Sequence, residues 1–286
     1  MTQLFNKKDF KDNCGFGLIA NTHGIRSHTV LTKSIDALVS MTHRGGVGSD
    51  GKTGDGCGLL FDINHKYFRD TIKQEQDIDL DQEFAVGQLF FSDCINNLTP
   101  KLEEIFKQES LNLIALREVP INKNILGDIA LDCCPNIYQV FVSSSDEVFN
   151  EKKFESNILQ ARKFIEEIYA DDETLYLCSF SSKTIVYKGL MLPNAIKDFY
   201  TELQKPQFEI STCVFHQRFS TNTSPRWHLA QPFRLLAHNG EINAIRGNRN
   251  WVKARSNKFT TPYIPKIQLF KELVNEKGSD SSSLDN

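Results

Sequence analysis

Residues 215–223 read Phe-His-Gln-Arg-Phe-Ser-Thr-Asn-Thr, and this stretch decides which fold we expect. A predicted strand at 208–216 leads into it, so its arginine and hydroxyl side chains follow the end of a strand. Four other short segments have equally unusual composition. In chain order they are Cys14–Gly17, His43–Gly45, His238–Asn243 and Gly278–Ser281. One such segment alone means little, but five in a fixed order form a specific pattern.

The composition excludes several classes of protein. The chain has 286 residues, of which 40% are hydrophobic, so it can bury a core. Lys and Arg number 33 against 36 Asp and Glu, and the net charge of −3 gives no general attraction to nucleic acid or anionic lipid. No apolar run approaches the ~18 residues of a membrane helix, and the N-terminus lacks the apolar centre of a secretory signal. We therefore expect a cytoplasmic protein with no nucleic-acid or membrane partner.

The cysteines favour a reducing compartment. There are seven, none in a Cys-x-x-Cys pair, and the adjacent Cys133 and Cys134 suit neither a simple disulfide nor a zinc site. We expect most of them to be small buried apolar groups, and we expect no bound metal.

Hydrophobic periodicity predicts one compact α+β or α/β unit, with its strands grouped rather than alternating strictly with helices. Helices are predicted over 31–42, 100–109 and 151–169. Strands are predicted at 15–21, 59–63, 84–91, 137–143 and 208–216, in a hairpin of 174–180 with 184–188, and around 234–238.

One glycine-rich motif falsely suggests a nucleotide-binding site. Residues 46–53 match the phosphate-binding pattern G-x-x-x-x-G-K-[ST]. That pattern binds phosphate only between a preceding strand and a following helix, so that backbone amides and the helix N-terminus surround the anion. Here a helix precedes it and a strand follows. We therefore reject a nucleotide site.

The five segments together resemble the class II glutamine amidotransferases, which are N-terminal-nucleophile hydrolases. Three longer stretches of sequence resemble the glutaminase domain of the glutamate synthase large subunit. They are GKTGDGCGLL at 51–60, FHQRFSTNTSPRW from Phe215, and HNGEINAIRGNRNW from His238. The resemblance covers Cys14 to Asn286. It implies a leader or propeptide at 1–13 and an amidotransferase domain at 14–286, incomplete at its C-terminal end. The implied fold is a four-layer αββα sandwich with two packed, mainly antiparallel sheets.

The chemistry of Cys14 agrees with that resemblance. If Met1–Asn13 are removed, Cys14 carries a thiol and a free α-amine in one residue. An α-amine with a pKa near 7.7–8.0 is roughly a tenth to a fifth neutral at pH 7, so it can act as the base, whereas a lysine amine near 10.4 is mostly protonated. On position alone, Cys14 is equally well explained as a buried strand cysteine.

The resemblance also implies a role for five other residues. Asn239, through its side chain, and Gly240, through its backbone N–H, would bind the oxyanion, and Gly240 would also contact the substrate. Arg44 would orient Cys14 and the oxyanion loop. Arg218 would grip the α-carboxylate of glutamine, and Asp280 its α-ammonium. The simpler interpretations are a hairpin turn for Asn239-Gly240, a helix C-terminal charge for Arg44, a surface ion pair for Arg218 and a helix cap for Asp280.

The implied reaction is hydrolysis of L-glutamine to L-glutamate and ammonia through a γ-glutamyl thioester on Cys14. In complete glutamate synthases, a synthase domain with FMN and an iron–sulfur cluster uses the ammonia to convert 2-oxoglutarate. No cofactor is expected within these 286 residues, and the expected partners are that synthase domain and a small subunit. Two alternatives remain open: an amidotransferase domain serving another acceptor, and a catalytically silent glutamine-binding or assembly fragment.

Overall fold

The strands form two four-stranded antiparallel sheets. The computed structural model describes residues 15–93, 95–170, 174–218, 224–238, 242–264, 267–270, 273–276 and 278–285. The first sheet, in spatial order, is β1 (Phe16–Ala20), β8 (Thr212–Gln217), β2 (Cys57–Asp62) and β7 (Thr184–Gly189). The second is β4 (Leu111–Glu118), β5 (Asn136–Ser144), β3 (Ala85–Phe91) and β6 (Leu175–Ser181).

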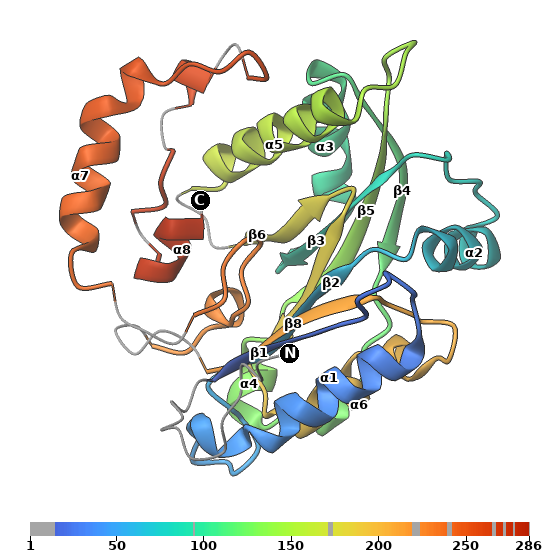
Figure 1. Ribbon diagram of the computed structural model, residues 1–286, viewed down its shortest axis with the longest axis vertical. Helices are drawn as coiled ribbons and strands as arrows, with labels where there is room; N and C mark the ends of the chain where they lie inside the picture. The colour runs from blue at the N-terminus through green and yellow to red at the C-terminus, as the bar shows by residue number, and fades with distance from the viewer. Residues whose placement is uncertain are drawn as a thin grey trace, which may run out of the picture.

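Helices cover the outer faces of the two sheets (Figure 1). Helix α1 (His28–Ser40) packs against β1 and β8, and helices α3 (Ile95–Gln108) and α5 (Glu151–Ile168) pack over the second sheet. Strand β3 shows how the layers meet, because its side chains alternate between two hydrophobic clusters. Leu89 and Phe91 join the cluster under α3 and α5, while Val86 and Phe90 join the cluster shared with the first sheet. The expected α+β sandwich is confirmed.

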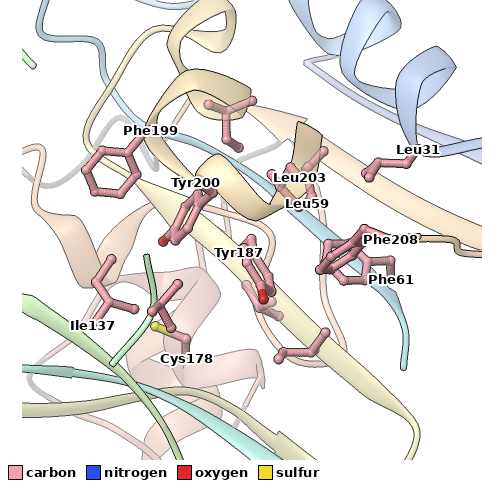
Figure 2. Close-up of a cluster of buried hydrophobic side chains, with 14 of the residues drawn as sticks. Leu31, Leu59, Phe61, Ile137, Cys178, Tyr187, Phe199, Tyr200, Leu203 and Phe208 are labelled. Carbon is pink, nitrogen blue, oxygen red and sulfur yellow. The ribbon is translucent and has the colours of Figure 1, made fainter. Parts of the chain in front are cut away.

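Aromatic side chains fill the larger cluster (Figure 2). The ring of Tyr187 on β7 lies 5.1 Å from that of Phe61 on β2 and 4.8 Å from that of Tyr200. Phe208 packs edge-on against Phe61, at 5.4 Å between ring centroids. These large, fully buried rings lock the first sheet to the chain segment that leads into β8.

The predicted helices are confirmed, with shifted ends. Helix α1 begins at His28 rather than residue 31, because Ser27 caps it by accepting a hydrogen bond from the backbone N–H of Val30 at 3.4 Å. Helix α3 begins at Ile95 rather than residue 100. The expected start rested on Pro100, which instead lies inside the helix. Proline there removes one backbone donor and crowds the carbonyl of Asn96, but a buried stripe including Leu98 and Leu102 continues through it.

The strand expected around 234–238 is wrong. The backbone there forms a local turn, in which the N–H of Phe233 donates to the Leu236 carbonyl at 2.8 Å, and Leu235 is 89% exposed. Arg234 accounts for the difference, because its guanidinium pairs with Glu166 and Asp285 and so draws the segment away from a sheet edge.

Several elements carried no clear sequence signal. They are β4 and the helices α2 (His65–Gln76), α4 (Asp128–Asp132), α6 (Ile196–Phe199), α7 (Ile245–Arg255) and α8 (Asp280–Asp285). Across the described ranges, no helix combines the length and apolar character needed to cross a membrane.

The phosphate-loop motif at 46–53 has the surroundings expected from the sequence, with a helix before it and a strand after it. It lies between a short 3-10 helix at Thr42–Arg44 and strand β2. Its own side chains close the loop, because the Asp50 carboxylate accepts hydrogen bonds from the backbone N–H groups of Lys52 and Thr53 at 3.0 and 2.8 Å. No helix N-terminus follows to bind a phosphate.

The thiols are all free in the described part of the chain. Cys57, Cys178 and Cys213 are buried as expected, whereas Cys133 is exposed and Cys134 half-buried at the end of the short helix α4. Among the described residues, no cluster of three or more His, Cys, Asp or Glu side chains could hold a metal ion.

A buried ionic network ties the second sheet to the segment before β8. Arg117 on β4 is 1% exposed, and its guanidinium donates to Glu202, which is fully buried, at 2.8 Å and to Glu75 at 2.7 and 3.0 Å. Gln139 accepts from Arg117 and donates to the Tyr187 hydroxyl, which donates to Glu202 at 2.5 Å. Each buried charge is therefore paired, as the low local polarity requires.

Arg117→Leu should destabilise the fold by about 3–5 kcal/mol, because it leaves the Glu202 carboxylate buried without its cation. Urea unfolding measures the loss. Lys183→Ala is the control, since it removes an exposed ion pair with Glu151 and should leave the unfolding midpoint unchanged. Equal midpoints for the two variants would contradict a structural role for this network.

Candidate active site

Strand β8 holds the first three unusual segments together. The backbone N–H of Gln217 donates to the Gly15 carbonyl at 2.6 Å, so the residue after Cys14 lies beside the residue before Arg218. Gly45, which follows Arg44, packs on the same strand end: a Cβ there would collide with the side-chain amide nitrogen of Gln217. Gly45 thus permits a close approach to the end of the Gln217 side chain, and it brings the Arg44 turn to β8.

The fourth segment joins through His216. Its Nε2 lies 2.7 Å from the backbone carbonyl of His238. A carbonyl can only accept, so Nε2 carries the hydrogen and the ring is fixed in one tautomer. Burial lowers the pKa of His216 to about 4, so the imidazole is neutral near pH 7. His216 therefore connects two segments and does not serve as a charged group.

The fifth segment joins through His238 and Asp280. The imidazole Nε2 of His238 lies 2.6 Å from Ser281 Oγ. The Asp280 carboxylate accepts hydrogen bonds from the backbone N–H of Ser281 at 2.7 Å and from that of Ile242 at 2.9 Å. Asp280 is 6% exposed, so its carboxylate is held in one orientation at the buried start of α8.

Arg218 has an unusual backbone. Its φ is +98°, a region that residues other than glycine rarely adopt, and its N–H donates to the carbonyl of Gly56 at 2.9 Å. Such strain persists only where the surroundings impose it, and it concentrates at functional sites. Among the described residues, the Arg218 guanidinium has neither a hydrogen-bond acceptor nor a carboxylate partner.

The structure thus brings together the segments that carry part of the expected site. Arg44, Arg218 and Asp280 belong to segments that are linked to one another by direct contacts. Cys14, Asn239 and Gly240 lie outside the described residues, although the neighbours Gly15 and His238 are part of the same linked arrangement.

Lys188 was missed by sequence reasoning. It lies fully buried on β7, and its ammonium donates to the His228 carbonyl at 2.7 Å while sitting over the rings of Tyr176 and Phe233 at 4.8 and 4.7 Å. Burial lowers its pKa to about 8. Lys188 holds the segment that leads to His238. No sequence motif around residue 188 indicates this role.

Gln217 was also missed. Its side chain is fully buried, and neither its amide oxygen nor its amide nitrogen has a hydrogen-bond partner within the described residues. Its position between Gly15 and Gly45 shows how tightly the segments approach one another. Gln217 lies beside Arg218 in the stretch 215–223, but no sequence pattern there indicates that its side chain is buried.

A separate cavity of about 310 Å³ lies between α5, the β6–β7 hairpin and the turn at Arg234. Its lining includes Glu155, Arg162, Ser181 and Asp285, and no described residue of the five segments contributes to it. The cavity therefore lies apart from the described part of these segments.

Comparison with known proteins identifies the family. The model of the family "Glutamine amidotransferases class-II" matches residues 14–286. The ferredoxin-dependent glutamate synthase of Cyanidium caldarium is 38% identical over 96% of this chain and 18% of its own length. The NADPH glutamate synthase large chain of Bacillus subtilis is 38% identical over 99% of this chain and 19% of its own. The ferredoxin-dependent glutamate synthase 1 of Arabidopsis thaliana is 39% identical, over 99% and 18%.

The chain therefore spans about a fifth of the length of these relatives. The match begins at Cys14, includes all five segments, and accompanies a two-sheet α+β sandwich that links those segments through β8. The chain belongs to the class II glutamine amidotransferases.

Proposed function

We propose that residues 14–286 hydrolyse L-glutamine to L-glutamate and ammonia and supply the ammonia to a glutamate synthase. The observation that carries this proposal is the convergence of the five segments: Gly15, Gly45, His216, His238 and Asp280 are joined by contacts that start from one strand end. The family match and the glutamate synthase relatives support both the glutaminase chemistry and the acceptor.

In the proposed mechanism, Cys14 attacks the side-chain amide carbon of glutamine. The α-amine of Cys14 takes the thiol proton and later delivers a proton to the departing ammonia. The side chain of Asn239 and the N–H of Gly240 stabilise the oxyanion, and Arg44 orients both partners. A γ-glutamyl thioester remains, and a water molecule, activated by the same amine, hydrolyses it to glutamate and regenerates the thiol.

Two charged side chains would select glutamine as a zwitterion. The Arg218 guanidinium would pair with the α-carboxylate in a forked contact, and the Asp280 carboxylate would accept from the α-ammonium. The strained Arg218 backbone and the fixed Asp280 carboxylate support this assignment, because prearranged groups lose little freedom on binding.

The surrounding enzyme is also part of the proposal. A synthase region beyond these residues would carry the FMN and iron–sulfur cluster that the resemblance implies and would use the ammonia, together with a small subunit in some relatives. The free thiols of the described residues support a reducing, cytoplasmic location.

Removal of the leader is the first requirement. The active protein should begin at Cys14, because only a free α-amine can serve as the base. Intact-mass measurement of the purified chain reads the N-terminus directly. A homogeneous, fully active protein that still carries Met1 would rule the mechanism out.

Arg218→Lys and Asp280→Asn should each lower kcat/KM for glutamine about ten- to hundredfold. Each loses a charge-assisted contact of ~1.5–3 kcal/mol, and lysine cannot reproduce the forked geometry. Steady-state kinetics measure the loss. Asp36→Asn, on the exposed face of α1, is the control and should have no effect. Unchanged kinetics in both site variants would refute the substrate assignment.

Asn239→Ala should lower kcat by ~10²–10³ with little change in glutamine binding, since it removes one oxyanion donor and leaves both substrate contacts. Cys14→Ser should retain little activity, and Cys14→Ala, produced without residues 1–13, should bind glutamine without turnover. Rapid-quench kinetics and calorimetry separate these outcomes. A raised glutamine Kd with unchanged kcat in Asn239→Ala would place this residue in binding instead.

A glutamine-analogue electrophile should modify Cys14 alone. Burial raises the pKa of Cys178 and Cys213 to about 12, so their thiols stay protonated and inert. The exposed Cys133 is the internal control, because the reagent can reach it but it lacks the α-amine and the oxyanion donors that make Cys14 reactive. Peptide mass mapping, with glutamine as protectant, locates the label. Glutamine-protected labelling at another cysteine would mean that the nucleophile is misplaced.

A further inference from the structure

Helix α7 contributes nothing to the hydrophobic core. No residue of Ile245–Arg255 is buried, and the helix stands apart from the sheets at the left of Figure 1, beyond α8. Its sequence forms the second half of the HNGEINAIRGNRNW motif, of which the proposed mechanism uses only Asn239 and Gly240. A helix without core contacts needs another reason to hold a fixed position.

One side chain of α7 makes that connection. The half-buried Arg249 donates through Nε to Ser283 Oγ at 2.9 Å. Its Nη2 donates to Ser283 Oγ at 2.6 Å and to the carbonyls of Gly278 and Ser279 at 3.1 and 3.4 Å. These acceptors lie on both sides of Asp280, so one guanidinium spans the turn that carries this carboxylate.

The same helix reaches Asp280 by a second route. The backbone N–H of Ile242, three residues before α7 begins, donates to Asp280 Oδ2 at 2.9 Å. The chain from Ile242 to Arg249 therefore grips both the carboxylate and the backbone around it. Ser283 strengthens the arrangement, because its hydroxyl also donates to the Asn275 carbonyl at 2.6 Å.

We propose that Arg249 is a positioning residue for substrate specificity: it fixes the turn of Gly278–Ser283 so that the Asp280 carboxylate meets the α-ammonium of the amino-acid substrate. The inference rests on the proposed function. Two guanidinium nitrogens of Arg249 share three neutral oxygens, which suits the forked donors of arginine and not the single ammonium of lysine. Its contribution is geometric, since a displaced carboxylate loses its contact with the ammonium.

Glutamine affinity in the catalytically silent Cys14→Ala chain, produced without residues 1–13, tests the inference without interference from turnover. Calorimetry should show that Arg249→Ala raises the Kd for glutamine ~10–100-fold, as expected when a binding group is misplaced. Arg249→Lys should recover only part of the affinity. Arg255→Ala is the matched control, because this arginine of the same helix stacks on Trp251, 4.7 Å from its ring, and makes no contact with the Asp280 turn.

A double-mutant cycle separates positioning from general stability. If Arg249 acts through Asp280, adding Arg249→Ala to Asp280→Asn should weaken binding no further. In the active chain, Arg249→Ala should raise KM and leave kcat within about twofold. Should Arg249→Ala fail to fold in a thermal melt, Ser283→Ala, which removes one acceptor of Arg249, is measured in the same cycle.

The outcomes distinguish the two proposals. Additive losses in the cycle, or an Arg249→Ala chain with unchanged glutamine affinity while Asp280→Asn binds weakly, would overturn the role of Arg249 and leave the proposed function standing. If Asp280→Asn itself binds glutamine normally, the Asp280 contact of the proposed function is wrong, and the positioning role falls with it.

Discussion

The hydrogen bond from His216 to the His238 carbonyl is the interaction on which the site depends. It leaves from β8, which lies between β1 and β2 in the first sheet and is thereby fixed on both sides. One residue further along, Gln217 binds Gly15 and packs under Gly45, and the next residue is Arg218. Of these three consecutive residues at one strand end, His216 and Gln217 contact other segments of the site and Arg218 is itself an expected site residue. A neutral, buried imidazole suits this purpose, because a charged one would cost far more to bury.

Secondary structure was easiest to predict from the sequence where the apolar side chains of an element are fully buried. The run at 84–91 becomes β3, whose seven residues are all buried between two clusters, and the apolar stripe around Phe154 and Ile158 becomes α5. Elements with mixed surroundings were harder to predict. Helix α2 buries only four of its twelve residues, one of them a threonine, and α7 buries no residue, so few apolar side chains mark either helix in the sequence. The turn at Arg234 looked like a strand because its charge partners, Glu166 and Asp285, are distant in the chain.

For the site, the sequence singled out five segments but not how they are joined. Arg218 and Asp280 could be singled out because they lie in recognisable short segments, and the structure links those segments through His216, His238 and Ser281. Arg249 and Gln217 lie within the same motifs. Their roles depend on the contact of Arg249 with Ser283 and that of Gln217 with Gly45, which no local sequence pattern encodes. The backbone of Arg218 is a further example, since arginine does not favour a positive φ and the residue donates its N–H to the Gly56 carbonyl, far away in the sequence.

Lys188 has an energetic consequence for the whole molecule. Its pKa falls from the ordinary 10.5 to about 8 because burial disfavours the ammonium. Below pH 8 the folded chain therefore carries the full penalty of a charged lysine in its interior, roughly 3 kcal/mol by linkage, and the penalty fades as the pH rises toward 10.5. An apolar side chain of similar length would avoid it. The chain thus gives up stability at neutral pH to keep one donor on the His228 carbonyl, and the fold is less stable than its apolar core alone would make it.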